Sequence, residues 1–410
     1  MKVLFLESYF KPEKTSGAHL AEDMRKELIK RGHSLCVYAP TPTRGIDDDT
    51  RKKYIKLKHE TDFDGALKIH RFSLFGEGKN TLLRAFRYCI LELRLLVCAL
   101  FCEKADLIPM GSTPPINGIL TTIVKKIRKI PFVYTVQDMF PESLVSTGMT
   151  KKGSLLYKIG SWVSNLTYKN ASHIIVITKS MKEALVKKGV PDTKITVVPN
   201  WIDTDEVVPV QRAENQLFDE FGLDRDSFYV TYAGNIGNSQ NVELLAECAK
   251  RLYKHSDIKF VIFGDGSQKD KLESFIKDNN LDNIYLFPMQ PKERISEVYS
   301  LGDISFVICK KGVGKGAFPS KAATIMATGT SIIASFDEDS ELCRVVTENE
   351  LGTCVPPEDS EAASRAILDM YENNLCAKYG ENGRKAAKEL FSKEVNLAKR
   401  IKVYEDCILK

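Results

Sequence analysis

Residues 229–242 read YVTYAGNIGNSQNV, in which an apolar run of strand length ends in a glycine-rich turn just before a helix. Gly234 and Gly237 let the backbone approach a ligand closely, because glycine has no side chain and tolerates unusual backbone angles. The helix predicted from about Val242 presents a positive N-terminus, which favours an anion such as a phosphate. This strand, turn and helix predict a parallel α/β sheet that binds its ligand beyond the carboxyl ends of the strands.

The same alternation of strand-length apolar runs and helical stretches extends outward to both ends of the chain. The second half adds as strands Lys259–Phe263, Ile284–Phe287, Ile304–Ile308 and Ser331–Ala334. The first half offers Val3–Leu6, Ser34–Tyr38, Leu67–Phe72, Leu107–Met110, Phe132–Val136 and Ile174–Thr178. A chain of 410 residues is too long for one ordinary core and suits two domains of about 200 residues each. We therefore expect two doubly wound domains, residues 1–203 and 204–384, followed by a helical tail at residues 385–410.

The composition is that of a globular protein, with 43% hydrophobic and 28% charged residues. The 59 Lys and Arg residues exceed the 54 Asp and Glu residues by only five charges, which does not indicate nucleic acid as a partner. The opening run Met1–Leu6 lacks the length and cleavage site of a signal peptide, and no stretch reaches the ~18 apolar residues of a membrane-spanning helix. The ten cysteines are scattered, with one close pair at Cys98 and Cys102, so we expect a cytoplasmic protein with reduced thiols.

Three further strand ends in the second half carry residues suited to a nucleotide. Gly264-Asp265-Gly266 can approach a flat or anionic group, and the irregular segment Pro288–Pro291 has backbone amides that could read a base edge. The loop Lys310–Lys321 contains four lysines and three glycines and runs into a helix. Point charges and backbone donors at a helix start are what a pyrophosphate needs. A solvated lysine loop is the alternative, but four such loops at successive strand ends of one domain favour a ligand site.

The helical stretch Leu82–Phe101 combines a strongly apolar face with Arg84, Arg87 and Arg94. This pattern favours a core helix with a solvated basic edge, and the alternative is a helix that lies in a membrane interface near anionic lipids. Basic clusters at Lys125–Lys129, Lys151-Lys152 and Lys187-Lys188 lie in the same half of the chain. The sequence thus allows a cytoplasmic protein that is either free or peripheral on the inner face of the cell membrane.

Phe318–Lys321 (FPSK) followed by Met326–Gly329 (MATG) resembles the donor-binding motif of family 4 glycosyltransferases, which have the GT-B fold. Gln137–Glu142 (QDMFPE) is similar to a segment of the branch that builds bacterial capsule, O-antigen and colanic acid, in which the chain looks L-fucosamine transferase-like. The resemblance covers nearly the whole chain and includes Phe10–Pro12, Ser16-Gly17, Arg31–His33 and the hinge Val198–Asp203.

This resemblance implies a retaining glycosyltransferase that uses a nucleotide sugar and requires neither a metal nor another cofactor. It implies two Rossmann-like, doubly wound domains that face each other across a cleft, with the tail helix packing back on the N-terminal domain. The N-terminal domain would hold the acceptor and the C-terminal domain the nucleotide sugar. Within the resembled branch a UDP-linked acetamido sugar is favoured, and a GDP-sugar remains open. If the N-terminal half contacts the membrane, the simplest expectation for the acceptor is a saccharide linked to a polyprenyl diphosphate.

The resemblance assigns roles to individual positions of this chain. Donor binding falls to Gly234, Asn235, Gly237, Gln240, Gly264, Asp265, Gly266, Met289, Lys315, Pro319, Ser320, Lys321 and Thr324. Acceptor binding falls to Ser16, Gly17, His19 and Asp138. For catalysis we expect Lys321 to stabilise the leaving diphosphate, and Asp138 or Glu142 to orient a hydroxyl or act as a base.

The chain departs from the family pattern where the family clamps the donor phosphates and ribose. Asn235 and Gln240 stand in place of an arginine and a lysine, and Gly316 and Thr324 in place of two glutamates. Gln137 stands where the family has a catalytic-site histidine. We therefore assign the charge of the diphosphate to Lys321 and Lys315.

Two other classes of protein remain open on these residues. A nucleotide-sugar 2-epimerase of GT-B-like fold would convert the donor without any acceptor. A catalytically silent glycosyltransferase-like subunit would explain the neutral residues at the clamp positions. An NAD-dependent oxidoreductase is disfavoured, because the first strand leads to Glu7–Phe10 and not to a glycine-rich dinucleotide turn.

Overall fold

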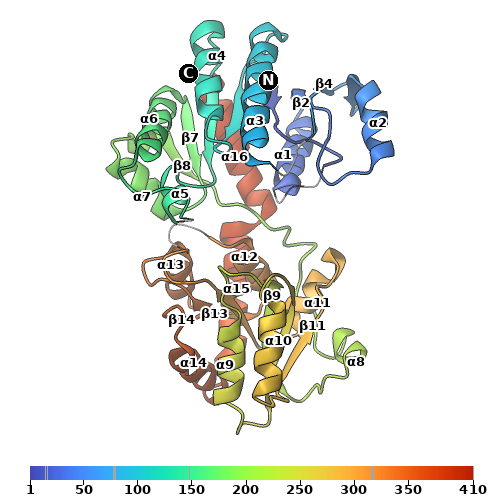
Figure 1. Cartoon of the computed structure of the whole chain (residues 1–410), viewed down its shortest axis with the longest axis vertical. Coiled ribbons are helices and arrows are strands. Elements are labelled where there is room, and N and C mark those ends of the chain that lie inside the picture. The colour runs from blue at the N-terminus through green and yellow to red at the C-terminus, as the bar shows by residue number, and fades with distance from the viewer. Residues whose placement is uncertain (14, 16, 77–79, 147, 315–317, 410) are drawn as a thin grey trace. The chain divides into compact units, whose positions relative to one another are not determined.

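The computed structural model describes all 410 residues except 14, 16, 77–79, 147, 315–317 and 410. The chain forms two compact units (Figure 1). Unit 1 comprises Met1–Val198 and Leu397–Lys410, and unit 2 comprises Pro199–Asn396. Both units have parallel sheets covered by helices, which confirms the predicted α/β class.

In unit 1, two runs of strands meet at a central pair. One run has the order β1-β2-β4-β3 and comprises β1 (Lys2–Leu6), β2 (Ser34–Pro40), β4 (Leu67–Phe72) and β3 (His59–Asp62). The other has the order β5-β6-β7-β8 and comprises β5 (Ile108–Gly111), β6 (Phe132–Val136), β7 (His173–Val176) and β8 (Ile195–Val197). A parallel bridge between Val3 and Leu107 joins β1 to β5. All pairs are parallel except β3 with β4, so the carboxyl ends of β1, β5 and β6 share one edge.

Helices α2, α6 and α7 of unit 1 begin after a residue whose side chain satisfies one of the first backbone donors. The side chain of Ser154 accepts a hydrogen bond from Tyr157 N at 3.2 Å, and that of Thr178 accepts one from Met181 N at 3.1 Å. The helices are α1 (Ala18–Lys30), α2 (Asp48–Lys56), α3 (Thr81–Phe101), α4 (Asn117–Arg128), α5 (Glu142–Ser146), α6 (Leu155–Asn170), α7 (Lys179–Lys187) and the short η1 (Asp192–Lys194). None of the helices in the described residues has the length and apolar content needed to cross a membrane.

Within its described residues, unit 2 has one parallel sheet of six strands in the order β11-β10-β9-β12-β13-β14. The strands are β9 (Phe228–Asn235), β10 (Ile258–Asp265), β11 (Ile284–Phe287), β12 (Ile304–Ile308), β13 (Ser331–Ser335) and β14 (Gly352–Val355). The helices are α8 (Leu217–Glu220), α9 (Glu243–Arg251), α10 (Lys269–Asp278), η2 (Lys292–Arg294), α11 (Ile295–Ser300), α12 (Ser320–Ala327), α13 (Glu341–Glu348), α14 (Ser360–Glu372), α15 (Cys376–Ala386) and η3 (Ala387–Phe391).

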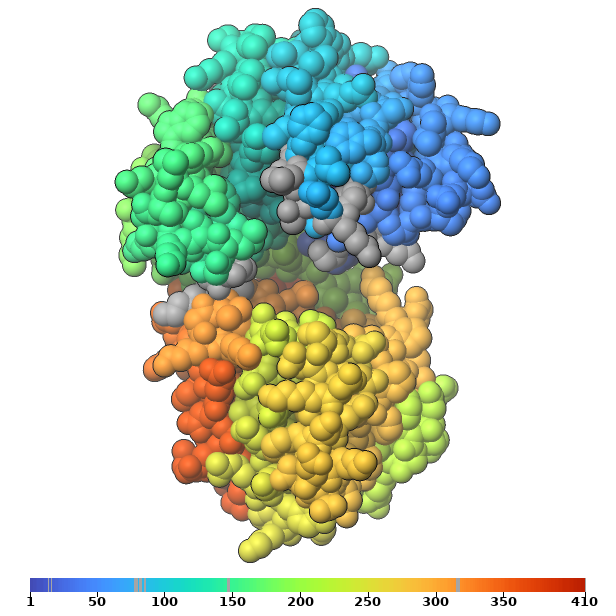
Figure 2. Space-filling model, in the orientation of Figure 1, coloured from blue at the N-terminus to red at the C-terminus, as the bar shows by residue number. Residues whose placement is uncertain are grey.

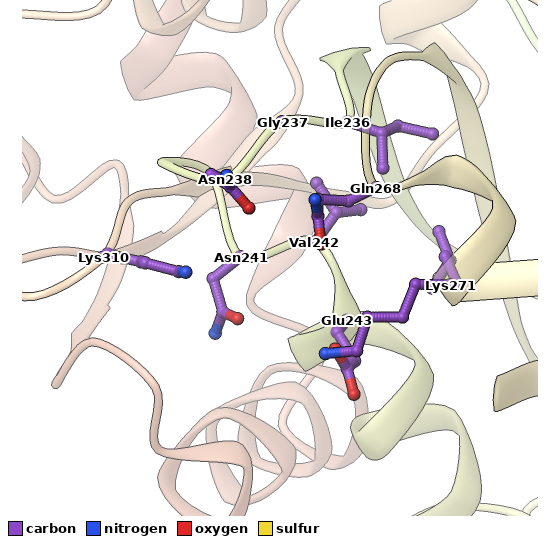
Figure 3. Close-up of a pocket in the computed structure, with 10 residues that line it drawn as sticks. Ile236, Gly237, Asn238, Asn241, Val242, Glu243, Gln268, Lys271 and Lys310 are labelled. Carbon is purple, nitrogen blue, oxygen red and sulfur yellow. The ribbon is translucent and has the colours of Figure 1, made fainter.

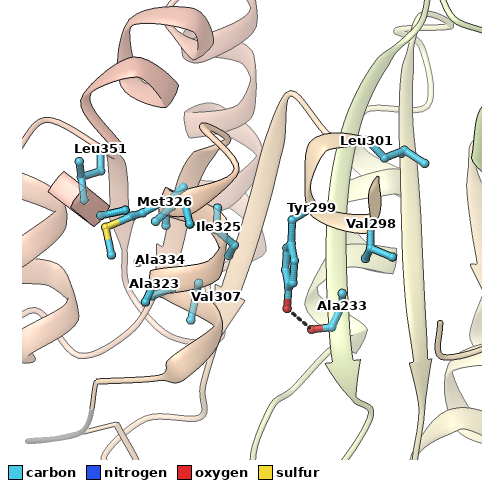
Figure 4. Close-up of a cluster of buried hydrophobic side chains, with 14 of the residues drawn as sticks. Ala233, Val298, Tyr299, Leu301, Val307, Ala323, Ile325, Met326, Ala334 and Leu351 are labelled. Carbon is cyan, nitrogen blue, oxygen red and sulfur yellow. Dashed lines mark hydrogen bonds between the residues drawn. The ribbon is translucent and has the colours of Figure 1, made fainter. Parts of the chain in front are cut away.

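A buried apolar cluster lies directly under the carboxyl end of β9 (Figure 4). It joins Val298 and Tyr299 of α11 to Met326 of α12. The hydroxyl of Tyr299 donates a hydrogen bond to the carbonyl oxygen of Ala233 at 3.4 Å, which satisfies a polar group that would otherwise be buried without a partner (Figure 4). The core therefore fixes the last residues of β9.

The compact units divide the chain a few residues away from the predicted boundaries. Residues 199–203 and 385–396 pack with unit 2, because Ile202 bridges to Ser392 and Lys393 pairs with Asp203 at 3.0 Å. Arg384 also donates hydrogen bonds to carbonyl oxygens of Thr204 and Val207. The predicted tail helix is broken at Ser392, whose backbone is extended, and α16 (Lys393–Ile408) restarts beyond it. The last part of α16 belongs to unit 1.

Candidate functional site

The carboxyl ends of β9 and β10 meet at a close backbone contact that only glycine permits. Gly234 pairs with Gly264 and Asn235 with Asp265 in the parallel register. A Cβ atom at Gly264 would lie 2.5 Å from the carbonyl oxygen of Gly234, and one at Gly266 would lie 2.5 Å from that of Ile236. The structure thus brings these predicted donor-binding residues together in one rigid turn pair.

Lys321 reaches this turn from the first turn of α12. Its Nζ donates a hydrogen bond to the carbonyl oxygen of Ala233 at 3.1 Å and lies 4.0 Å from the ring centroid of Tyr232. A Cβ atom at Gly234 would lie 2.8 Å from this nitrogen, so the missing side chain of Gly234 leaves room for the ammonium group. Among the described residues, no carboxylate pairs with Lys321.

Burial changes the protonation of this lysine. Desolvation lowers the pKa of Lys321 from the ordinary 10.5 to about 8, because the low-dielectric surroundings disfavour the ammonium form. An anion placed beside the group would restore the charged form. Perturbed ionisable groups at the carboxyl ends of sheet strands are typical of functional sites.

The two neutral residues of the turn contact each other. The amide nitrogen of the Asn235 side chain lies 3.4 Å from Oε1 of Gln240, across Gly237. A Cβ atom at Gly237 would lie 2.5 Å from the first and 2.9 Å from the second. The side chains of Asn235 and Gln240 therefore lie next to each other. They are neutral amides at the two positions where the resembled family has an arginine and a lysine.

A small hollow lies behind the turn, at the starts of α9 and α10 (Figure 3). Lys310 extends into it toward Asn241, and its backbone N–H donates to the carbonyl oxygen of Ser239 at 2.9 Å (Figure 3). Lys271, which also lines the hollow, is paired with Glu243 at 2.6 Å. Within the described part of the chain, the ammonium group of Lys310 has no carboxylate partner. Lys310 belongs to the predicted basic loop Lys310–Lys321 but was not among the residues assigned to the donor, and it lies two residues past the end of β12.

The remaining predicted donor residues are spread more widely. Met289 is half exposed and follows β11, two strands away from β9. Pro319 caps α12 and Ser320 begins it, while Thr324 is buried and donates to the carbonyl oxygen of Ser320 at 3.4 Å. Lys315 and Gly316 lie outside the described residues.

In unit 1, Asp138 stands exposed just past the end of β6. The segment around it is anchored on both sides: Gln137 N donates to the hydroxyl of Ser112 at 3.0 Å, and the hydroxyl of Ser164 donates to the carbonyl oxygen of Phe140 at 2.9 Å. A Cβ atom at Gly160 of α6 would lie 2.8 Å from the ring of Phe140. This glycine lets the segment pack closely on α6 and holds Asp138 in place.

Glu142 points into a different set of contacts. Its Oε1 lies 2.7 Å from Lys188 Nζ and accepts a hydrogen bond from the hydroxyl of Tyr157 at 3.3 Å. Burial raises the pKa of Glu142, but the hydrogen bond and charge of Lys188 and the other donors outweigh burial, and the net pKa is lowered. The carboxylate therefore links α5 to α6 and to the end of α7.

The predicted acceptor residues of the first loop lie at the start of α1. Gly17 is the residue before α1 and His19 is in its first turn, and both are exposed. Ser16 lies outside the described residues. Because β1, β5 and β6 are parallel neighbours, the start of α1 and Asp138 lie at the same edge of the sheet.

Sequence reasoning missed a buried carboxylate at this edge. Glu13 accepts hydrogen bonds from the backbone N–H groups of Thr43 at 2.7 Å and Arg44 at 2.8 Å, and so ties the loop after β1 to the loop after β2. No motif in the sequence marks Glu13, because its partners are backbone groups that only the fold brings near.

Two family models match the chain, one on each half. The model described as Glycosyltransferase Family 4 matches residues 17–206, and the model described as Glycosyl transferases group 1 matches residues 213–386. Among described residues of both halves, no cluster of three or more His, Cys, Asp or Glu side chains could hold a metal ion.

Three curated relatives are similar to this chain over different lengths. The probable glycosyltransferase WbjE of Pseudomonas aeruginosa is 27% identical and covers 72% of this chain and 74% of its own. The putative colanic acid biosynthesis glycosyl transferase WcaI of Escherichia coli K12 is 24% identical, covering 93% and 96%. An Escherichia coli enzyme named UDP-Gal:alpha-D-GlcNAc-diphosphoundecaprenol alpha-1,3-galactosyltransferase is 30% identical, covering 44% and 46%.

Solved structures share the fold across the whole chain. Sucrose-phosphate synthase of Thermosynechococcus elongatus superposes with a TM-score of 0.75 at 16% identity, covering 99% of this chain and 98% of the other. HepE of Anabaena, in complex with UDP, superposes with a TM-score of 0.72 at 16% identity, covering 99% and 100%. At this level of identity the likeness establishes the fold alone.

Proposed function

Because the chain is a glycosyltransferase of the GT-B fold, with a family 4 domain followed by a group 1 domain, we propose a specific reaction for it. In this proposal the enzyme transfers an acetamido sugar from a UDP-sugar to a saccharide linked to a lipid diphosphate, with retention of configuration. The product would be part of a cell-surface polysaccharide.

The observation that carries this proposal is the desolvated ammonium group of Lys321 at the end of β9. It has no carboxylate partner among the described residues, and it adjoins a turn whose glycines let the backbone of β9 and β10 and the ammonium group approach one another closely. A buried cation without a counter-ion is costly, and a bound diphosphate removes that cost. Such a group is prepared to stabilise the charge that develops on a leaving diphosphate.

The choice of donor and acceptor draws support from proteins similar to this chain. The name of the galactosyltransferase relative states a UDP-sugar donor and a diphosphoundecaprenol-linked acceptor. HepE was crystallised with UDP, and also with UDP and glucose. WcaI is named for colanic acid biosynthesis. We extend these chemistries to this chain because one sheet edge carries Lys321 beside the turn at Gly234, as a diphosphate donor would need, and the other carries Asp138, which could orient a hydroxyl.

In the proposed mechanism the donor diphosphate lies against the turn at Gly234 and the ammonium of Lys321. The bond between the anomeric carbon and the departing phosphate oxygen breaks, and the acceptor oxygen bonds to that carbon on the same face while the phosphate oxygen takes the acceptor's proton, so the configuration is retained. Asp138, fixed at the end of β6, orients a hydroxyl of the acceptor or donor. Charge compensation comes from lysine and backbone N–H groups, and we propose that no metal ion is required.

The test is thermal stabilisation of the purified protein by UDP, compared with GDP, ADP and dTDP. A nucleotide at a hundred times its dissociation constant should add about 2.7 kcal/mol to the free energy of unfolding. Lys321→Ala should lose the response. Lys254→Ala is the matched control, because Lys254 is an exposed lysine of unit 2 before the start of β10, at the opposite edge of the sheet.

A response to UDP that is lost in Lys321→Ala and kept in Lys254→Ala supports the donor site. A stronger response to GDP than to UDP would change the proposed donor to a GDP-sugar and leave the proposed donor site unchanged. The absence of any response would reject a donor-binding enzyme and return the silent subunit to consideration. The family models and the named relatives do not favour a 2-epimerase, which would consume donor without acceptor.

A further inference from the structure

Helix α3 exposes an unbroken apolar stripe on the side away from its core contacts. The side chains recur every three or four residues, which places them on one face of the helix. They are the exposed Leu83, Phe86, Leu93, Val97 and Phe101, with the half-buried Ile90 among them. Phe101 alone is 84% exposed. A core helix does not require this outer stripe, since Leu91, Leu95 and Ala99 already fill the interior.

Two further helices of unit 1 repeat the pattern. At α4 the exposed residues are Ile116, which directly precedes the helix, and Ile127, and the half-buried Ile119 and Ile123 lie between them. On α6 the exposed apolar residues are Leu155, Leu156, Ile159 and Trp162, and the indole-bearing Trp162 is 61% exposed. Large apolar side chains exposed one by one are ordinary, whereas three stripes on adjacent helices indicate a surface that is covered in function.

The three helices form one layer. Helix α4 contacts α3 on one side and α6 on the other. In Figure 2, the light blue to green segments of these helices lie next to one another on the visible face of unit 1. We call the exposed residues of α3, α4 and α6 the three-helix face.

The charges around the three-helix face are almost all positive. The sequences of α3, α4 and α6 contain eight Arg and Lys residues, of which Arg87 is buried, and one acidic residue, the buried Glu92. Exposed lysines that have no ion-pair partner within the described residues border the face: Lys126, Lys129, Lys151, Lys152 and Lys158. An apolar centre with a basic border complements a surface that is apolar below and anionic at its headgroups.

We propose that the three-helix face is a membrane-docking surface that binds anionic phospholipid, with the stripes inserted at the headgroup boundary. Trp162 has the character of an interfacial anchor, because its ring is apolar and its N–H is polar. A second copy of this chain fits less well, because a two-fold contact would bring two lysine-bordered faces against each other. The inference rests on exposed side chains and charge, and it stands independently of the donor and acceptor proposed above.

The test uses vesicles of phosphatidylglycerol and phosphatidylethanolamine that contain no acceptor lipid, with the full chain and no nucleotide. Flotation measures the partition of the protein onto the vesicles. The chain has two tryptophans and Trp201 is buried, so a blue shift of the emission on adding vesicles reports on Trp162.

We expect binding to these vesicles and little binding to pure phosphatidylcholine. Leu93→Ser combined with Trp162→Ser should lower the partition by about tenfold or more, since two exposed apolar groups no longer enter the interface. Tyr253→Ser in unit 2 is the matched control, because Tyr253 is also exposed and lies outside the face. Lys152→Glu with Lys158→Glu should weaken binding to anionic vesicles and leave binding to phosphatidylcholine as weak as before.

Three outcomes would overturn the proposal. They are no binding to anionic vesicles, binding that the Leu93 and Trp162 substitutions leave intact, and a concentration-dependent dimer that those substitutions dissolve while vesicles have no effect. Circular dichroism and the melting temperature confirm that each variant is folded. Since neither nucleotide nor acceptor is present, failure here would leave the donor-site test untouched.

Discussion

The carboxyl edges of the two sheets differ in how completely the folded chain has built them. In unit 2, Gly264 and Gly266 pack against backbone, Gly234 packs against the side chain of Lys321, and the ammonium group of Lys321 is desolvated at the end of β9. In unit 1, Asp138, Gly17 and His19 are exposed, and no side chain is within 4 Å of the place where a Cβ of Gly17 would stand. The edge proposed for the donor phosphates is thus preorganised by close contacts, whereas the edge proposed for the acceptor is open.

The difference follows from the chemistry expected at each edge. A leaving diphosphate needs charge and donors that are fixed before reaction, because stabilisation of developing charge works when no reorganisation is required. An acceptor hydroxyl needs orientation, which the acceptor's own binding supplies in part. The following predictions test this contrast, from the largest expected effect to the smallest.

The largest effect is expected for Lys321→Met. Catalytic turnover should fall about 10²–10³-fold, or about 3–4 kcal/mol in transition-state stabilisation, because a fixed cation next to the leaving group is lost. The free energy of unfolding should stay the same or rise, because a desolvated charge is replaced by an apolar side chain. Transfer assays and chemical denaturation measure the two quantities. A variant that loses stability and turnover together would make Lys321 a structural residue.

A pair of glycine substitutions compares the rigidity of the two edges. Gly264→Ala should lower the free energy of unfolding by about 1–3 kcal/mol, because the new Cβ would stand 2.5 Å from the carbonyl oxygen of Gly234. Gly17→Ala should change it by less than about 0.5 kcal/mol, since its Cβ meets nothing. Equal effects in urea denaturation would remove the contrast between the edges.

The pH dependence of nucleotide binding tests the buried ammonium. Burial lowers the pKa of Lys321 to about 8, and a bound diphosphate should raise it again. Affinity for UDP should therefore be constant below about pH 8 and fall by up to tenfold per pH unit above it, as the free protein loses the proton. Without nucleotide, the free energy of unfolding should depend on pH in the opposite direction to the UDP affinity. The unfolded chain binds more protons than the folded chain between about pH 8 and 10.5, so stability rises with pH in that window.

Titration calorimetry in buffers of different ionisation enthalpy should detect proton uptake on UDP binding near pH 8. The same experiment with Lys254→Ala should give unchanged uptake. Uptake that persists in Lys321→Met would assign the proton to another group.

The smallest effect is expected for Glu142→Gln in unit 1. Its side chain is 40% exposed and its partner Lys188 is 30% exposed, so solvent screens the pair and the loss should be about 0.2–1 kcal/mol. The pKa of Glu142 is lowered in the folded protein, so this stability is present above the ordinary carboxyl pKa and disappears as pH falls through the folded value. Melting temperatures of wild type and variant should therefore converge in acid. A large loss of turnover at neutral pH with little loss of stability would instead give Glu142 a role in catalysis.

Much of the fold could be read from local patterns. The strand Tyr229–Ala233 and its glycine turn are contiguous, so their apolar length and backbone freedom predict them without knowledge of distant residues. The same holds for the stretch 82–101, whose helical period is confirmed in α3. The break in the tail helix could not be predicted in this way, because the extended backbone at Ser392 depends on its bridge to Ile202, nearly two hundred residues away in sequence.

The sequence by itself determined the class of protein and the order of its elements, and it located the glycine turn that we propose binds a phosphate, because these follow from periodicity, glycine and short motifs. Only the tertiary structure decided which charges are buried and which surfaces remain open. Lys321 is desolvated because β9, α12 and the ring of Tyr232 surround it, and Glu142 is paired because α5 and the end of α7 meet. The apolar stripes of α3, α4 and α6 became one face because those helices pack side by side. Burial and adjacency depend on contacts between distant residues, and a linear pattern does not contain them.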